Sequence, residues 1–112
     1  MKDDLVYIRH IQDAIDKISK YIGNYAYEDF INDQKTVDAV IRNIEIIGEA
    51  STKCSNKLKK KYGGIPWQKM VSARNKMIHD YMGVMTDIIW GICKDDLPAL
   101  KKQLAKHFGE EY

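Results

Sequence analysis

Residues 67–81 read WQKMVSARNKMIHDY, and this stretch carries the pattern on which the predicted fold depends. Positions 67, 70, 71, 74, 77, 78 and 81 follow the alternating three- and four-residue spacing of one face of an amphipathic helix. The apolar members of this face are Trp67, Met70, Val71, Met77 and Ile78. Arg74 shares the face, although a buried arginine is costly unless a counter-charge pairs with it. The pattern therefore predicts a helix whose inner face presents a guanidinium to a neighbouring surface.

His79 adds a second chemically active side chain to the same helix. It follows Arg74 by five residues, which on a regular helix is roughly 140° around the axis and about 7.5 Å along it. The two side chains could line a common cleft where the helix meets a neighbour or a second copy of the chain. An arginine binds phosphate bidentately and an imidazole transfers protons near neutral pH, so the pair suits phosphodiester chemistry. A histidine near a helix end can equally be a cap or a structural residue, and spacing alone leaves both interpretations open.

The composition fits one soluble domain. The chain has 112 residues, 45% hydrophobic and 30% charged, with a net charge of +2 that neither requires nor excludes a nucleic-acid partner. Cys54 and Cys93 have no metal-ligand spacing, so we expect buried thiols in a reducing cytoplasm and no metal site. The longest apolar run, residues 88–93, is too short to cross a bilayer. We therefore expect a cytoplasmic protein that is neither exported nor embedded in a membrane.

The hydrophobic periodicity predicts an all-α fold, an up-and-down bundle of four main helices with short extra helical turns. The expected elements are a helix over residues 4–22, one or two turns over 25–33, and helices over 34–54, 66–80 and from 85 or 86 onward. Gly48 lies inside the second long helix, where glycine is unfavourable, so we expect it to permit the close approach of another backbone. Pro98 predicts a kink or a break near Asp95 and Asp96.

A lysine-rich segment precedes the Arg74 helix, and its lysines are Lys53, Lys57, Lys59, Lys60 and Lys61. Most such runs are solvated helix faces. The functional interpretation is a patch that contacts RNA phosphates without reading the base sequence. On that interpretation we assign RNA contacts to Lys57, Lys60 and Lys61, and also to Lys76 beside Arg74.

Four segments in the right order resemble HepT-type HEPN proteins, the toxin half of a bacterial and archaeal toxin–antitoxin pair. Residues 74–81 are similar to the Arg-x4-His-x-Tyr motif of this family. Residues 47–50 (IGEA) and 65–67 (IPW) are similar to its preceding segments, and residues 96–100 (DLPAL) to its proline-broken last helix. The resemblance covers almost the whole chain, so it implies a single HepT-like HEPN domain over residues 1–112.

The resemblance implies a metal-independent endoribonuclease that works as a homodimer and needs no cofactor. Arg74 and His79 would be the catalytic pair, and Asn75 would help to fix the local geometry. Tyr81 would accept AMP from a nucleotidyltransferase antitoxin of the MntA type. Such a nuclease cleaves RNA because the 2′-hydroxyl supplies a nucleophile that DNA lacks.

Two further hypotheses stay open at this point. Helical domains of this shape also serve as non-catalytic binding partners of minimal nucleotidyltransferases, and a purely structural helix bundle is the third possibility. Cleavage of RNA in the presence of a chelator separates the first hypothesis from the other two.

Overall fold

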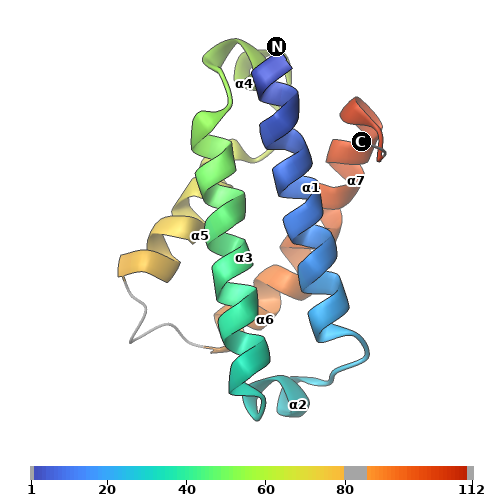
Figure 1. Ribbon diagram of the computed structural model, residues 1–112, viewed down its shortest axis with the longest axis vertical. Helices are drawn as coiled ribbons and strands as arrows, with labels where there is room; N and C mark the ends of the chain where they lie inside the picture. Colours follow the sequence, from blue (N-terminus) through green and yellow to red (C-terminus); the bar gives the residue numbers. More distant parts are fainter. Residues whose placement is uncertain (1, 80–85, 111–112) are drawn as a thin grey trace.

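The computed structural model describes residues 2–79 and 86–110, and it confirms the all-α fold (Figure 1). The helices are α1 (Lys2–Ile22), α2 (Tyr27–Ile31), α3 (Gln34–Lys53), α4 (Asn56–Lys61), α5 (Trp67–His79), α6 (Thr86–Gly91), the π-helical segment η2 (Ile92–Asp96) and α7 (Leu97–Phe108). The predicted bounds for the two long N-terminal helices differ from the observed ones by two residues or fewer.

The isoleucine stripe predicted for the first helix forms the buried side of α1. Ile8, Ile11, Ile15 and Ile18 are at most 3% exposed, because their spacing keeps them on one helical face against α3. The helix stops at Gly23, whose φ of 51° is a left-handed conformation that glycine adopts without strain.

α3 begins at an aspartate whose side chain caps the helix. The Asp33 carboxylate accepts hydrogen bonds from the backbone N–H of Thr36 and from its hydroxyl, at 3.2 and 2.6 Å. The same carboxylate accepts a 2.6 Å hydrogen bond from the hydroxyl of Tyr25. These bonds lower the pKa of Asp33 and raise that of Tyr25, because both stabilise the ionised aspartate beside a protonated phenol.

A buried carboxylate joins the start of α1 to the connection between α3 and α4. Asp4 is 5% exposed and accepts hydrogen bonds from the Ser55 backbone N–H at 2.7 Å and from the Ser55 hydroxyl at 2.6 Å. Ser55 Oγ in turn accepts from the Leu58 N–H at 3.1 Å, so it is the N-cap of α4. This junction fixes where α4 departs from the bundle.

The last predicted helix contains a π-helical segment where the sequence predicts a kink or a break. η2 covers Ile92–Asp96, and the N–H of Leu97 donates to the carbonyl of Ile92, five residues back. A π-helical turn inserts one extra residue into the helix, and such turns are a known cause of bends. The kink or break expected near Asp95 and Asp96 is therefore a local widening, after which Pro98 occupies the first turn of α7.

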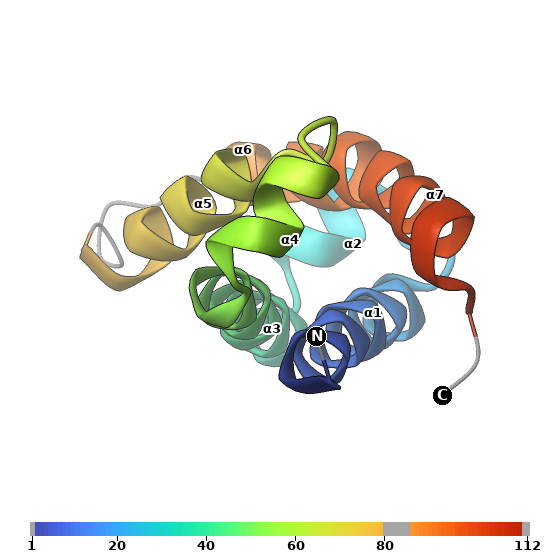
Figure 2. The ribbon, with the colours of Figure 1, turned by 90° about the horizontal axis from the view of Figure 1, so that it is seen from above.

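α3 is the central helix of the arrangement. It packs against α1 on one side and against α5 on the other, and viewed from above α1 and α5 lie on opposite sides of it (Figure 2). α7 returns to α1, where the Arg9 guanidinium donates to the carbonyl oxygens of Phe108 and Gly109 at 2.8 and 3.0 Å. α5 is thus anchored mainly through α3, which leaves much of its surface open to solvent or to a partner.

Candidate active site

α3 and α5 approach each other closely at Gly48 and Arg74. A Cβ placed on residue 48 would lie 2.8 Å from the Cγ of Arg74 and 2.9 Å from the carbonyl oxygen of Met70. Real Cβ atoms do not approach that closely, so the packing of the two helices requires glycine here. This confirms the close backbone approach predicted at Gly48, and it shows that the arginine itself is the neighbour.

The Arg74 side chain is held at this contact with an incomplete set of partners. It is 23% exposed, and its Nη1 lies 3.8 Å from Oε2 of Glu49, which is 55% exposed. Its Nε is buried and has no hydrogen-bond partner among the described residues. A guanidinium carries five N–H donors, and because the Nε–H is buried, an added anion would meet the terminal Nη groups. The predicted misfit of Arg74 on the apolar face is therefore present in the structure.

His79 lies on a different face of α5 from Arg74. Its side chain is exposed and lines a shallow groove with Ser72, Asn75 and Lys76. Arg74 contacts α3, and the helical turn places His79 roughly 140° away around the axis. Within one chain the structure thus brings His79 together with Asn75 and Lys76, but it does not bring the imidazole into the cluster of Arg74 and Glu49.

The predicted RNA-binding lysines occupy two separate places. Lys76 borders the groove of His79, whereas Lys57, Lys60 and Lys61 are exposed on α4. α4 lies near the end of α5 where that helix begins, and His79 is at the other end (Figure 1). Trp67 and His79 are twelve positions apart, which is about 18 Å of helix. The fold therefore separates the α4 lysines from the groove that Lys76 borders.

The predicted AMP acceptor lies outside the described residues. The structure describes α5 to His79 and resumes at Thr86, so Tyr81 and the predicted end of the helix at Asp80 fall in the gap. The assignment of Tyr81 stays a prediction that rests on the sequence.

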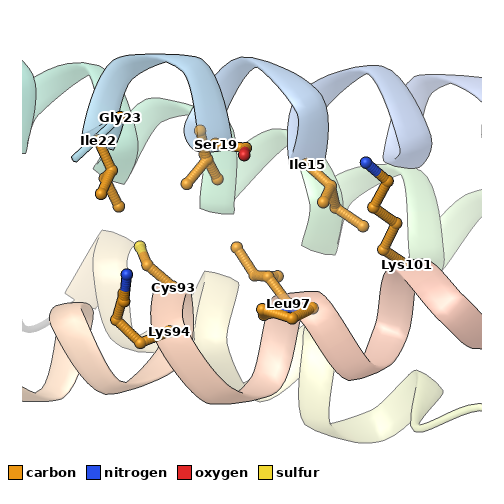
Figure 3. A pocket seen from close by; sticks show the side chains of 10 residues that line it. Ile15, Ser19, Ile22, Gly23, Cys93, Lys94, Leu97 and Lys101 are labelled. Carbon is orange, nitrogen blue, oxygen red and sulfur yellow. The ribbon is translucent and has the colours of Figure 1, made fainter.

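An apolar hollow lies away from the groove of His79 and holds different chemistry. One cavity of about 200 Å³ lies between α1 and the η2–α7 region, lined by apolar side chains that include Ile15, Ile22, Cys93 and Leu97 (Figure 3). Burial raises the pKa of Cys93 to about 12 and that of Cys54 to about 11, so both thiols are protonated at neutral pH, as expected of the buried cysteines that the sequence predicts. Neither thiol is suited to act as a nucleophile.

A second apolar cleft, of about 220 Å³, lies between α5 and the η2–α7 region. Lys69 and Asp96 form an ion pair of 3.2 Å at this cleft. Ser72 and Lys76 border both the cleft and the groove of His79. The cleft thus adjoins the candidate site and shares a serine and a lysine with it.

Two residues at the site had no assigned role from the sequence. The IGEA segment indicates no role for Glu49 beyond that of a polar residue near the cleft, and Ser72 carries no signal beyond its place on the polar side of the helix. Helical spacing does place Ser72 and Lys76 four residues apart on one face, which could have indicated their shared groove. The pairing of Glu49 with Arg74 depends on the relative position of α3 and α5. The sequence pattern of either helix alone does not predict that position.

Two structural findings bear on metals and membranes. Within residues 2–79 and 86–110, no three His, Cys, Asp or Glu side chains are grouped in a way that could hold a metal ion. Over the same described residues, no helix combines the length and the apolar character needed to span a bilayer.

Comparison with known proteins gives a consistent result. The family model described as "Ribonuclease HepT-like" matches residues 11–107. A Thermococcus cleftensis protein named "Probable ribonuclease HepT" is 42% identical over 100 residues, which are 89% of this chain and 91% of that protein. A provisionally named RNase of Caldanaerobacter subterraneus subsp. tengcongensis is 32% identical over 111 residues, 99% of each chain. No solved structure gave a significant match.

Proposed function

Because the chain belongs to the HepT-like ribonuclease family, and is on that ground an endoribonuclease, we propose that it is the toxin of a toxin–antitoxin pair. It acts in the cytoplasm, cleaves RNA without a metal ion and is neutralised by a nucleotidyltransferase. The observation that carries the proposal is the Arg74 guanidinium, which is held at the α3–α5 contact with a 3.8 Å ion pair to Glu49 at one terminal nitrogen.

The proposed reaction is transfer of a phosphodiester to the neighbouring 2′-oxygen. The 2′-hydroxyl attacks phosphorus, the bond from phosphorus to the 5′-oxygen breaks, and a cyclic phosphate and a 5′-hydroxyl result. One proton leaves the 2′-oxygen and one reaches the departing 5′-oxygen, and His79 is the group that carries protons. Arg74 binds the phosphate oxygens and stabilises the charge that develops on them. Asn75, which shares the groove of His79, helps to place the substrate.

A homodimer is part of this proposal, because one chain presents Arg74 and His79 in different directions. A second copy related by a two-fold axis would place its own α5 against the first, so that arginine and imidazole from the two chains face one phosphate. Ile78 supports this arrangement. It lies four residues after Arg74, on the same side of α5, and is 43% exposed although it is a large apolar residue.

Neutralisation is proposed to occur at Tyr81 by transfer of AMP from the antitoxin to the phenol oxygen. Pyrophosphate leaves when the nucleotide donor is ATP, and the phenol loses its proton. Tyr81 follows His79 by two residues and Arg74 by seven, so a phosphate attached there lies in the sequence neighbourhood of both. The added negative charge would compete with RNA for the guanidinium, and the nucleotide would obstruct the site.

The test is cleavage of a labelled single-stranded RNA by the purified chain, with and without EDTA. The expected result is cleavage at the same rate in both conditions. The matched substrate has the same sequence with 2′-O-methyl groups and should stay intact, because it lacks the nucleophile. Cleavage abolished by EDTA would contradict the metal-independent mechanism. An intact RNA in all conditions would favour the non-catalytic binding partner of a nucleotidyltransferase instead.

A further inference from the structure

Glu49 is the acidic side chain next to the candidate catalytic arginine. It follows Gly48 on α3, so the glycine that admits Arg74 also places the carboxylate beside the guanidinium. Its Oε2 lies 3.8 Å from Nη1 of Arg74. Glu49 is 55% exposed and Arg74 is 23% exposed, so the carboxylate sits on the solvent side of the pair.

The buried part of Arg74 determines where an anion can bind. The Cβ and Cγ of the arginine are packed over Gly48, and its Nε is buried without a hydrogen-bond partner among the described residues. An incoming phosphate therefore meets the terminal Nη nitrogens. Glu49 is paired with one of these nitrogens. The Glu49 carboxylate and a bound phosphate thus approach the guanidinium from the same side.

The Glu49–Arg74 pair is weak enough to be displaced. A separation of 3.8 Å is longer than a hydrogen bond, and an ion pair whose carboxylate is exposed to solvent contributes little. A phosphate can form two charge-assisted hydrogen bonds with a guanidinium and so compete well with this contact. The carboxylate nevertheless stays tethered to α3 close to the arginine, where it repels a second negative charge.

We propose that Glu49 is a built-in competitor for RNA phosphate. It neutralises Arg74 in the free protein and limits the affinity of the site for RNA, and it is displaced when a phosphate binds. The inference rests on the proposed function, in which Arg74 binds the phosphate of an RNA chain. It makes Glu49 a determinant of substrate affinity and leaves proton transfer to His79.

A purely structural role for Glu49 predicts something different. If the ion pair only fastened α5 to α3, its loss would lower stability and would leave RNA affinity unchanged or reduced. A competitor predicts the opposite sign for affinity. The two roles are therefore separated by the direction of the change in binding when the negative charge is removed.

The experiment measures binding of a fluorescent single-stranded 2′-O-methyl RNA, which the proposed reaction cannot cleave. Glu49→Gln removes the charge and keeps the shape, and Glu49→Asp keeps the charge. The matched control is Asp38→Asn, which makes the same charge change on the exposed face of α3, eleven residues and roughly 16 Å from Glu49. A parallel KM and kcat measurement uses cleavable RNA.

We expect Glu49→Gln to lower Kd roughly two- to fivefold at low salt. The gain should shrink at 0.5 M salt, because exposed charges are screened there. With cleavable RNA the change should appear in KM more than in kcat. Glu49→Asp should bind close to the parental level, and Asp38→Asn should shift Kd much less than Glu49→Gln.

Several results would overturn the inference. They are an unchanged or higher Kd for Glu49→Gln, equal shifts in Glu49→Gln and Asp38→Asn, and no measurable binding by any variant. A chain that binds with the expected pattern but cleaves no RNA would sink the proposed nuclease and leave this inference standing. If the chain cleaves RNA and both glutamate variants have the same KM, this inference is overturned and the proposed nuclease stands.

Discussion

The β-carbon of Arg74 occupies the space in which a side chain at residue 48 would have to lie. This contact links a backbone requirement on α3 to the position of the candidate catalytic cation on α5. A methyl group at residue 48 would also come within 2.9 Å of the carbonyl oxygen of Met70, so it meets backbone as well as side chain. The glycine of the IGEA segment and the arginine of the Arg-x4-His-x-Tyr segment therefore form one structural unit.

Gly48→Ala should destabilise the protein and displace Arg74. Overpacking of this kind costs about 1–3 kcal/mol, because α5 must shift away from α3. Denaturant unfolding measures the stability, and RNA cleavage reports the position of the arginine. Gly91→Ala is the control, since a Cβ there meets nothing within 4 Å and alanine favours the helix by about 0.5–1 kcal/mol. Equal stability effects at the two glycines would contradict the packing argument.

The sequence predicts the helices well because their apolar stripes are regular. The isoleucines of α1 and the caps of α3 are local signals, and local signals decide where a helix begins, ends and buries its face. A close backbone approach at Gly48 was also predictable, because a glycine inside a stable helix usually has a packing reason, but the sequence did not name α5 as the neighbour. These features depend on residues within a few turns of one another.

The rest of the site depends on long-range offsets. The axial position of α5 relative to α3 determines which acidic residue of α3 faces Arg74. In the structure that residue is Glu49. The bond from Ser55 to Asp4 joins residues 51 apart in sequence, and no periodicity predicts it. Charge alone grouped Lys57 with Lys76, although the fold separates α4 from the groove of His79. Composition identifies such groups, but only tertiary packing decides which members meet.

Removing either candidate catalytic side chain should abolish RNA cleavage and preserve the fold. Arg74→Ala keeps the Cβ that packs on Gly48, and His79 is exposed, so both variants should unfold near the parental denaturant concentration. Loss of the imidazole should cost roughly 10²–10⁴ in rate. Loss of the guanidinium should cost roughly 10²–10³.

Two further variants sharpen this test. Arg74→Lys keeps the charge but loses the planar pair of donors, so it should recover only part of the activity. His10→Ala changes an exposed histidine on α1 and should cleave like the parent. Folded Arg74→Ala and His79→Ala proteins that cleave RNA at the parental rate would place the active site elsewhere.

Ile78 tests the proposed dimer. Ile78→Lys should convert a dimer into a monomer in light scattering, because the new charge lies one turn from Arg74 on the face expected to meet the second copy. Ile31→Lys is matched in chemistry and in exposure, at 41% against 43%, but lies on α2 and should stay dimeric. A parental chain that is monomeric at micromolar concentration would argue against the two-chain site.

Tyr81 tests the proposed neutralisation. Co-expression with a nucleotidyltransferase partner should add the mass of one or more AMP groups, and peptide mass spectrometry should place them on Tyr81. The modified chain should cleave RNA poorly, because the phosphate competes for the cation at the site. Tyr81→Phe lacks only the acceptor oxygen, so it should escape both modification and neutralisation. AMP found solely on other tyrosines, or a Tyr81→Phe chain that the partner still silences, would refute the assignment.

Asp4 should make the stability of the fold sensitive to acid. The Ser55 hydroxyl and N–H donate to its carboxylate and lower its pKa below the ordinary value of 3.8. Because the folded-state pKa lies below the unfolded-state one, the stabilisation is complete above about pH 5 and is lost as the pH falls through the folded-state value. Asp4→Asn should therefore cost about 1–2 kcal/mol in the free energy of unfolding at pH 7. That difference from the parent should narrow towards pH 3.

Asp3→Asn is the control. It changes the neighbouring carboxylate, which is exposed to solvent, and should show little of either effect. Denaturant titrations of the three proteins across pH 3–7 measure both quantities. A gap between Asp4→Asn and the parent that stays constant over this range would mean that the ionised carboxylate is not what joins α1 to α4.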